Sequence, residues 1–298
     1  MDAGQTAASG HWLILGGAIL WGTTGTAQAF APAGFDPLVI GTLRLLVGGL
    51  AMLLLAVWRS ELTHFKAGKP MGFLLAAALI SGYQLCFFTA VAKTGVAIGT
   101  VVGIGSAPIA GGLLGYLFRG EKLGRRWLLA TVLAISGCTL LSLTGGAVTV
   151  NLLGIILAIG AGTFYAAFTL ILKGLLEDNS AIAVIAVVFC LGALLLSPLL
   201  LKTDINWLLQ PRSIAVAIHL GVAATTIPYL LFAQGLKTTQ VSTATTLSLA
   251  EPMTAATLGI ALLGEQLNLQ AFTGIFFIFS GLAVLVWTGC NRPRGAEA

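Results

Sequence analysis

Charged residues are scarce in this chain. Of its 298 residues only 8% are Asp, Glu, Lys or Arg, whereas 57% are hydrophobic; an ordinary soluble domain is roughly 25% charged. So few charges cannot cover the surface of a water-soluble protein of this length, and its most apolar stretches would lie outside, which only lipid tolerates. The composition therefore excludes a soluble enzyme and predicts an integral membrane protein with several spans.

Motifs of catalysis and metal binding are also missing. The chain has no GxSxG nucleophile motif, no HExxH zinc motif and no GxxxxGK[ST] nucleotide loop. Its three histidines form no ligand cluster, and we expect His219 to be structural. Its four cysteines form no CxxC pair, so we interpret them as small apolar residues between helices. We therefore expect no catalytic residue, no metal, no cofactor and no ATP-driven pumping, and predict that the chain is not an enzyme.

Basic residues lie mainly in short loops between apolar runs, which argues against nucleic-acid binding despite a net charge of +5. With a cytoplasmic N-terminus, eleven of them lie on the inner side and only three on the outer, namely Arg59, Lys66, Lys69, Arg119, Lys122, Arg125, Arg126, Lys173, Lys237, Arg292 and Arg294 against Lys93, Lys202 and Arg212. This bias predicts a multi-pass protein of the inner (plasma) membrane with both termini cytoplasmic. Its expected partners are the lipid bilayer and a small-molecule substrate; the oligomeric state stays open.

Ten apolar segments each approach the ~20 residues that cross a hydrocarbon core as a helix. They are residues 11–30, 38–58, 71–92, 95–118, 127–143, 152–172, 181–200, 213–235, 241–263 and 270–289. The expected fold is therefore all-α, with ten transmembrane helices. Pro228, which follows Thr225 and Thr226, should loosen the eighth helix.

An internal repeat divides the chain into two five-helix halves. An ungapped shift of 144 residues places Gly120-Glu121 on Gly264-Glu265, Pro108 on Pro252, and Trp21-Gly22 on Tyr165-Ala166. The first repeat covers residues 11–143 and the second 152–289, together forming one transport domain. Because five is odd, the second half enters the membrane from the opposite side, as in transporters built from inverted repeats.

Paired motifs mark the two halves: Trp21-Gly22, Arg44 and Pro108 before Gly120-Glu121 in the first, and Glu251-Pro252 before Gly264-Glu265 in the second. From about Trp12 to Trp287, the chain resembles the drug/metabolite transporter superfamily, most closely its EamA-type branch. The resemblance implies ten helices with cytoplasmic termini and export of amino acids, aromatic ones included, or other small metabolites. Val188 stands where the shift would place a counterpart of Arg44, so the halves are not equivalent.

Two charged residues fall within predicted spans. Glu251 lies near the middle of the ninth span, and Arg44 lies nearer the outer end of the second. A charge at such depth costs free energy, so Glu251 needs a partner, a watery cavity or a proton. One interpretation is substrate recognition or proton coupling; the other is a structural ion pair with Arg44. For Arg44 itself we favour a structural role.

Aromatic and amide side chains at mid-depth are candidates for the lining of a central cavity: Trp21, Gln28, Tyr83, Gln84, Tyr165 and Tyr229. An apolar face with one hydrogen-bonding atom suits an amphiphilic solute, and packing between helices is the alternative. The hydroxyls that begin the ninth span are expected to bond to their own helix. Small residues every four positions from Gly95 to Gly115 should pack closely against other helices. Glu121 and Glu265 should stabilise helix ends.

These features favour a secondary transporter that moves small amphipathic metabolites, above all amino acids, outward by alternating access through a cavity between the repeats. The six residues above, with Arg44 and Glu251, are its predicted substrate site. Nucleotide-sugar carriage is the alternative, although phosphate recognition would draw several basic side chains into the cavity. A membrane-embedded enzyme and a receptor are weaker alternatives, because the sequence offers neither a catalytic constellation nor a signalling domain.

The predicted orientation can be tested by cysteine labelling with a membrane-impermeant reagent. Ala147→Cys should react from outside the cell, and Gly68→Cys only after permeabilisation, because the loop charges place these positions on opposite sides. The parent chain controls for the four native cysteines. The opposite labelling pattern would reverse the orientation, and reaction of both positions from outside would overturn the span count.

Overall fold

The computed structural model describes residues 3–31, 37–66, 68–142, 151–201, 208, 210–263 and 269–290, and the regular elements within these ranges are all helices. Several residues named in the sequence analysis lie outside them: Ala147, Lys202, Gly264, Glu265, Arg292 and Arg294. The predictions that concern these positions are therefore not addressed by the structure.

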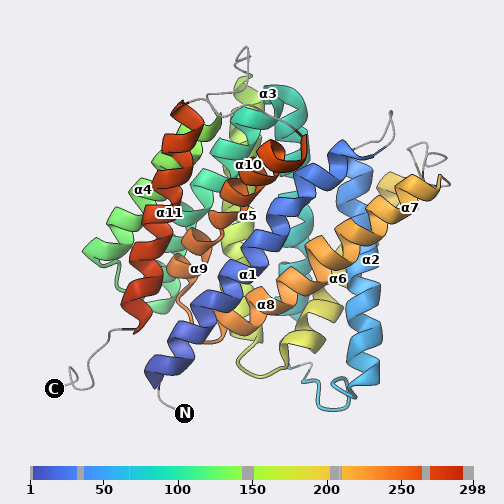
Figure 1. Ribbon diagram of the computed structural model, residues 1–298. Helices are drawn as coiled ribbons and strands as arrows, with labels where there is room; N and C mark the ends of the chain where they lie inside the picture. Colours follow the sequence, from blue (N-terminus) through green and yellow to red (C-terminus); the bar gives the residue numbers. More distant parts are fainter. Residues whose placement is uncertain are drawn as a thin grey trace.

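The helices form one bundle (Figure 1). In chain order they are α1 (Ala3–Ala29), α2 (Pro37–Trp58), α3 (Pro70–Arg119), α4 (Arg125–Ser142), α5 (Leu152–Leu175), α6 (Ala181–Leu200), α7 (Pro211–Ile218), the π-helix η2 (His219–Thr226), α8 (Ile227–Leu236), α9 (Val241–Leu247), α10 (Ala250–Leu263) and α11 (Leu269–Cys290). The start of α1 and the end of α11 lie at the same end of the bundle (Figure 1).

Seven segments of the described chain are long and apolar enough to cross a membrane: Val39–Trp58, Pro70–Thr94, Gly99–Arg119, Leu152–Leu175, Ala181–Leu200, Pro211–Leu236 and Leu269–Trp287. The other three predicted spans fall on α1, on α4, and on α9 with α10. Helix α1 is polar in its second half, α4 begins with two arginines, and the α9–α10 pair is interrupted after Leu247. The structure thus supports a multi-span helical protein, and the count of ten stays a prediction.

Helix α3 contains two of the predicted spans. Its 50 residues would extend about 75 Å if straight, far beyond a hydrocarbon core of ~30 Å. The chain instead reverses direction between Thr94 and Gly99. A Cβ added at Gly99 would lie 2.8 Å from the Cα of Val91, although eight residues of straight helix cover about 12 Å. The third and fourth predicted spans therefore pack against each other.

The eighth span is irregular, as Pro228 led us to expect. Its helical hydrogen bonding changes to the π pattern over η2, which ends two residues before Pro228. Proline has no N–H to donate to the carbonyl group of Ala224 four residues earlier. The hydroxyls of Thr225 and Thr226 donate to carbonyls five residues back, over 2.7 and 2.9 Å. The predicted loosening of this helix is confirmed, and it frees a backbone carbonyl inside the bundle.

Helices of the two halves meet at small residues, and these contacts recur after 144 residues. At four of these residues, all glycines, an added Cβ would collide with or crowd atoms of the neighbouring helix, so the helices pack closely there. Two related sets are Gly10 facing Thr238 with Gly154 facing Thr94, and Gly48 facing Thr225 with Gly192 facing Ser81. An internal repeat would produce this arrangement; the repeat boundaries and their opposite orientation stay predictions.

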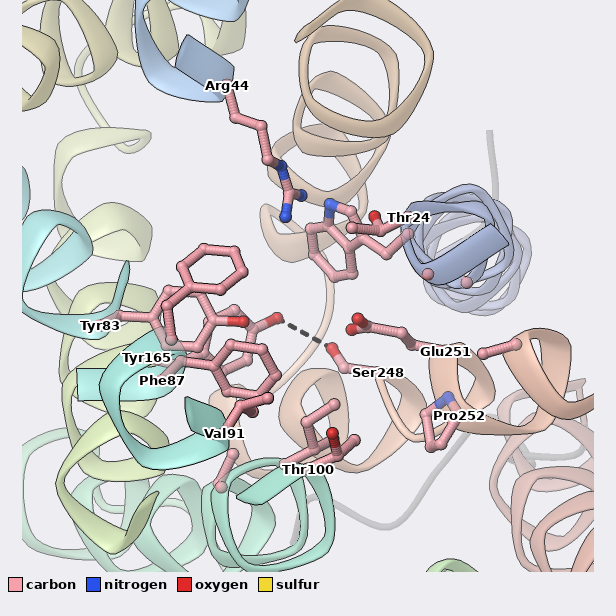
Figure 2. Close-up of a pocket in the computed structure, with 18 of the residues that line it drawn as sticks. Thr24, Arg44, Tyr83, Phe87, Val91, Thr100, Tyr165, Ser248, Glu251 and Pro252 are labelled. Atoms are coloured by element: carbon pink, nitrogen blue, oxygen red, sulfur yellow. Dashed lines mark hydrogen bonds between the residues drawn. The ribbon is translucent and has the colours of Figure 1, made fainter. Parts of the chain in front are cut away.

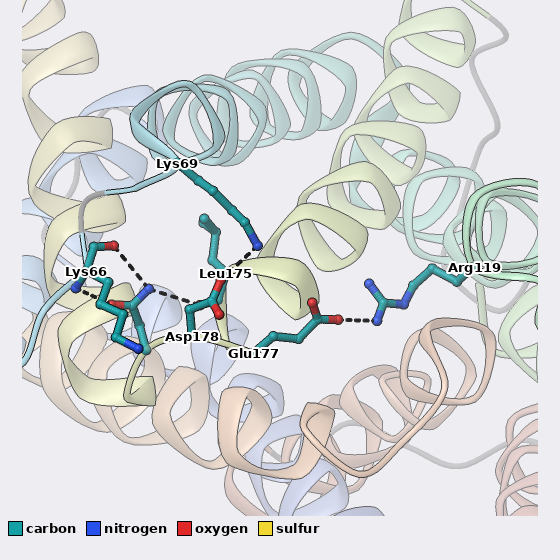
Figure 3. Close-up of polar contacts among 7 residues, drawn as sticks. Lys66, Lys69, Arg119, Leu175, Glu177 and Asp178 are labelled. Atoms are coloured by element: carbon teal, nitrogen blue, oxygen red, sulfur yellow. Dashed lines mark hydrogen bonds and ion pairs between the residues drawn. The ribbon is translucent and has the colours of Figure 1, made fainter.

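Polar contacts tie helices together at the end of the bundle where α5 finishes (Figure 3). Lys69 pairs with Asp178 over 2.8 Å, and Arg119 pairs with Glu177 over 2.5 Å. The hydrogen bond to Lys69 lowers the pKa of the Asp178 carboxyl and raises the pKa of the Lys69 ammonium. Both groups are therefore charged at neutral pH. Exposed pairs of this kind contribute little stability, but here they join α3 to the loop after α5.

Glu121 is a buried carboxylate that stabilises a helix end, as expected from the sequence. It is 6% exposed and accepts hydrogen bonds from the backbone N–H groups of Val241 and Ser242 over 2.6 and 3.0 Å. It also accepts the Ser242 hydroxyl over 2.7 Å, while Trp127 Nε1 donates to the Ser242 carbonyl. Glu121 therefore caps α9 from the other half of the chain, where free N–H groups favour a negative charge.

Replacing Glu121 with Gln should lower the free energy of unfolding by about 1–3 kcal/mol, because the amide loses charge-assisted bonds to buried N–H groups. Denaturant or thermal melts of the purified protein in detergent measure this loss. Glu177→Gln is the matched control: it removes a carboxylate from an exposed pair, which is worth about 1 kcal/mol or less. Equal effects of the two substitutions would contradict a capping role for Glu121.

Candidate functional site

A cavity of about 320 Å³ lies inside the bundle, between helices of the two halves (Figure 2). Residues of α1, α2, α3, α5, α8, α9 and α10, and of the break between the last two, form its wall. They are Trp21, Gly22, Thr24, Gly25, Gln28, Arg44, Tyr83, Phe87, Phe88, Val91, Thr100, Gly103, Ile104, Ala107, Tyr165, Tyr229, Thr245, Ser248, Glu251, Pro252 and Ala255. The wall is mostly apolar and aromatic, with a few polar groups, which is the usual character of a small-molecule site.

An aromatic cluster forms one side of the cavity. The ring of Trp21 packs edge-on against Tyr229, with centroids 4.8 Å apart, and lies 6.2 Å from the ring of Tyr165. Tyr83 lies 5.7 Å from Tyr165 and stacks on Phe87 at 5.8 Å. These offset and edge-to-face contacts fix the rings against one another. They hold an apolar surface in place before any solute arrives.

Seven of the eight predicted site residues line this cavity: Trp21, Gln28, Arg44, Tyr83, Tyr165, Tyr229 and Glu251. Gln84 does not belong to the wall. It is 2% exposed and packs toward Gly41 of α2. The side of α3 that carries Gln84 lies against α2, whereas Tyr83 faces the cavity. The prediction for Gln84 is not supported.

Several wall residues escaped the sequence analysis although helical spacing points to them. Phe87 and Val91 follow Tyr83 at intervals of four on α3, and Thr24 follows Trp21 at an interval of three on α1. Residues at these intervals share a helix face. Extending the face from each aromatic residue by one turn would have found them. Length and hydrophobicity alone could not, because neither determines how a helix is rotated.

Arg44 is held by the irregular eighth span. Its guanidinium donates from Nε to Thr225 Oγ1 over 3.1 Å and from Nη2 to the carbonyl of Ala224 over 3.0 Å. The carbonyl of Ala224 is the one that receives no helical hydrogen bond, because Pro228 has no N–H. These bonds use two of the five N–H donors of the side chain. Arg44 is 9% exposed and still lines the cavity, so it combines the expected structural role with a charge that faces the site.

Glu251 follows the break between α9 and α10. Ser248 and Leu249 are not helical, and Glu251 lies in the first turn of α10. Its carboxylate points into the cavity (Figure 2). Within the described residues no protein group hydrogen-bonds to this carboxylate. A charge at this depth must therefore be stabilised by a molecule bound in the cavity or by water there.

An ion pair between Arg44 and Glu251 was one interpretation of the sequence, and the structure does not contain it. In the described part of the chain the salt bridges within 4.0 Å are those of Lys69 and Arg119. Arg44 and Glu251 enter the cavity from different sides, with a gap between them (Figure 2). The guanidinium bonds to η2 instead, because the carbonyl of Ala224 receives no hydrogen bond from Pro228 and needs another donor.

Three hydroxyl groups at the start of the ninth span, those of Thr245, Thr246 and Ser248, bond to their own helix, as expected, whereas the Ser242 hydroxyl donates to Glu121. Thr245 donates to Val241 or Ser242, and Ser248 donates to Ala244. Ser248 also bonds to the Tyr165 hydroxyl over 2.9 Å, which joins α5 to the helix break. His219 lies 3.0 Å from the Thr23 hydroxyl, so it links η2 to α1 in the structural role expected of it.

A helical bundle with an aromatic cavity between its halves defines a multi-pass membrane protein with an internal small-molecule site. The model of the EamA-like transporter family matches the chain twice, over residues 8–143 and residues 152–287. The chain belongs to this family of membrane transporters, as the resemblance to the drug/metabolite transporter superfamily predicted.

Relatives of the chain are also described as transporters. It is 45% identical to the uncharacterized transporter YwfM of Bacillus subtilis over 285 residues, 96% of each chain. It is 24% identical to the uncharacterized inner membrane transporter YicL of Salmonella typhimurium, over 95% of this chain and 97% of that one. One crystal structure superposes with a TM-score of 0.82 over 94% of this chain and 97% of the other, at 17% identity, which shows a shared fold.

The separation of Arg44 and Glu251 predicts the outcome of a double-mutant cycle. Arg44→Gln should lower the free energy of unfolding by about 1–3 kcal/mol, because a buried carbonyl loses a charged donor. Glu251→Gln should leave stability unchanged or raise it, because it removes a charge at mid-depth. The double variant should show coupling below about 1 kcal/mol, against the ~3–5 kcal/mol lost when one partner of a buried pair is removed. Melts of the four proteins decide, and strong rescue in the double variant would establish an ion pair.

Proposed function

We propose that this protein is a secondary transporter of zwitterionic, amphipathic metabolites, above all amino acids with aromatic or other apolar side chains. The supporting observation is that Arg44 and Glu251 face one aromatic cavity without pairing with each other. A guanidinium suits a carboxylate, and a carboxylate suits an ammonium group. The aromatic wall suits the apolar side chain that lies between them.

The free-energy cost of the unpartnered Glu251 carboxylate favours such a ligand. An unpaired charge at the centre of a membrane helix costs about 2.5–3.5 kcal/mol on insertion scales. Glu251 has no hydrogen-bond partner among the described residues, so an incoming ammonium would offset part of this cost. Arg44, in contrast, already bonds to Ala224 and Thr225 and keeps further N–H donors for a ligand.

The size of the cavity separates this proposal from nucleotide-sugar transport. At about 320 Å³ it lies at the lower end of the ~300–1,000 Å³ range of small-molecule pockets. Arg44 is the basic residue among the wall residues that the structure describes. A diphosphate would be expected to require more than one cation. A single metabolite with one carboxylate fits both the volume and the charge.

The proposed mechanism is alternating access between two inverted repeats, 11–143 and 152–289, in the inner membrane with both termini cytoplasmic. Contacts that recur after 144 residues support the repeat. The polar links of Lys69, Arg119 and Glu121 gather at the end of the bundle where the loop charges predict the cytoplasm. A transporter closed at this end would release solute outward, which supports export.

Exchange of labelled L-phenylalanine in reconstituted vesicles tests the proposal. The parent protein should exchange internal for external L-phenylalanine. Tyr83→Ala should slow this exchange about tenfold, because burying an aromatic side chain of solute against the ring contributes about 1.4 kcal/mol or more. Tyr116→Ala is the control: it removes the same side chain from the same helix α3 at an outward-facing position that is 59% exposed.

Folding is checked for both variants by thermal melts, since Tyr83 also packs against Phe87 and Tyr165. A stable Tyr83→Ala protein that exchanges L-phenylalanine at the parent rate would move the site away from this cavity. Absence of exchange by the parent, for L-phenylalanine and for the other apolar amino acids, would contradict an amino-acid substrate.

A further inference from the structure

Two hydrogen-bond donors on α1 have no partner in the structure. The indole Nε1 of Trp21 and the hydroxyl of Thr24 are both covered from water, and neither makes a hydrogen bond within the described residues. Trp21 is 4% exposed, and both residues belong to the cavity wall. A buried donor without a partner costs about 1–3 kcal/mol, so such groups in native structures call for an explanation.

Several other side chains of the same kinds in this protein are satisfied, although the buried hydroxyl of Thr239, which lies outside the cavity wall, also has no partner among the described residues. Trp127 donates its indole N–H to the carbonyl of Ser242 over 3.0 Å. Thr163 and Thr169 on α5 donate back to carbonyls four residues earlier, both over 2.9 Å, which is the common state of a helical threonine. The fold can therefore satisfy such groups, and it leaves those of Trp21 and Thr24 without a partner although both residues belong to the cavity wall.

The two unpartnered donors belong to a turn of α1 on the Arg44 side of the cavity. Residues 21 and 24 are one helical turn apart and share a face of α1. Trp21 packs against Tyr229 at 4.8 Å, and Arg44 bonds to Thr225, one turn before Tyr229 on the same span. Figure 2 shows Thr24 and Arg44 at the same end of the cavity. Three kinds of donor, an indole N–H, a hydroxyl and a guanidinium, thus gather at one end.

We infer that Trp21, Thr24 and Arg44 form a subsite for the carboxylate of the transported solute. An indole N–H and a guanidinium can only donate, and a hydroxyl can donate to the same oxygens. A carboxylate accepts about four hydrogen bonds and carries the charge that Arg44 requires. The solute is therefore oriented, with its acid group toward α1 and α2 and its ammonium toward Glu251. This inference rests on the proposed function, because it assigns one end of the same cavity.

The test compares two probes, L-phenylalanine and L-phenylalaninamide, in which a carboxylate is replaced by a neutral carboxamide with fewer acceptor sites and two N–H donors. The pH is kept low enough for the amino group of both probes to be protonated. Their dissociation constants are measured by calorimetry on the purified full-length protein. The parent should bind L-phenylalanine at least about tenfold more tightly than the amide. Trp21→Phe and Thr24→Val should each reduce this preference about fivefold or more, since each removes one hydrogen bond to a charged group. Thr24→Val keeps the shape of the side chain, and Trp21→Phe keeps one aromatic ring.

Two controls match these substitutions. Trp12→Phe removes an indole N–H from a residue of α1 that is 61% exposed, and Thr163→Val removes a hydroxyl that is bonded to its own helix. Both should leave the preference for the acid unchanged. If the Trp21 and Thr24 variants also keep the parent's preference, their donors do not contact the carboxylate and the inference is wrong. Because Thr24→Val leaves the aromatic cluster intact, misfolding of the Trp21 variant cannot hide this result.

A third probe, 3-phenylpropionate, separates this inference from the proposed function. It has the carboxylate and the ring but lacks the ammonium. If vesicles exchange no amino acid but 3-phenylpropionate binds and loses affinity in Thr24→Val, the subsite is supported and the amino-acid proposal fails. If amino acids are exchanged and the acid preference does not change in the variants, the proposed function stands and the subsite is overturned. If the parent binds neither carboxylate probe, the subsite is overturned whatever the transport result.

Discussion

Direct contact between helix backbones is the constraint on which the cavity depends. A Cβ added at Gly22 would lie 2.8 Å from the carbonyl oxygen of Glu251, so α1 and α10 touch at this point. The neighbouring residue, Trp21, points about 100° away around the helix and packs on Tyr229 of α8. Glycine thus brings one pair of helices together while an aromatic ring fills the space beside it. The position of Glu251 in the cavity follows from this backbone contact more than from its own flexible side chain.

The position of Arg44 depends on the missing backbone N–H of Pro228. Pro228 has no N–H, so the eighth span changes to a π-helix and leaves the Ala224 carbonyl without its usual helical donor. In lipid this carbonyl must find a donor within the protein, and Arg44 supplies it over 3.0 Å. The same bond anchors the guanidinium at the cavity wall. In the proposed site, an arginine that looks purely structural from its hydrogen bonds would also determine where a negative ligand group binds.

The sequence predicts well how deep in the membrane a residue lies along its helix. It predicts poorly in which direction around the helix axis the side chain points. Trp21, Tyr83, Tyr165 and Tyr229 were found because aromatic residues far from the interface stand out, and the irregular eighth span was found because proline removes a donor. Gln84 lies outside the cavity wall because its side of α3 packs against Gly41 of α2, a contact that the sequence does not reveal. The pairing of Arg44 with Glu251 could not be judged either, because it depends on how helices from distant parts of the chain are rotated and on the unforeseen carbonyl of Ala224. Rotation is fixed by tertiary contacts such as that of Gly22, which no local pattern reveals.

The two halves of the scaffold are similar, but the charged groups of the site are not repeated. Under the 144-residue shift Arg44 corresponds to Val188, and Glu251 corresponds to Ala107. Val188 is fully buried, and Ala107 lies on the cavity wall without a polar group. Each half thus contributes one charge, from helices that the repeat does not relate. Under the proposed function, a ligand with two opposite charges would bind in one orientation only, and exchange of the two halves between open and closed forms would not require it to turn. Within the proposed mechanism, the duplication produced the two halves that move against each other. In this mechanism, the two charges that are not repeated, Arg44 and Glu251, recognise the substrate.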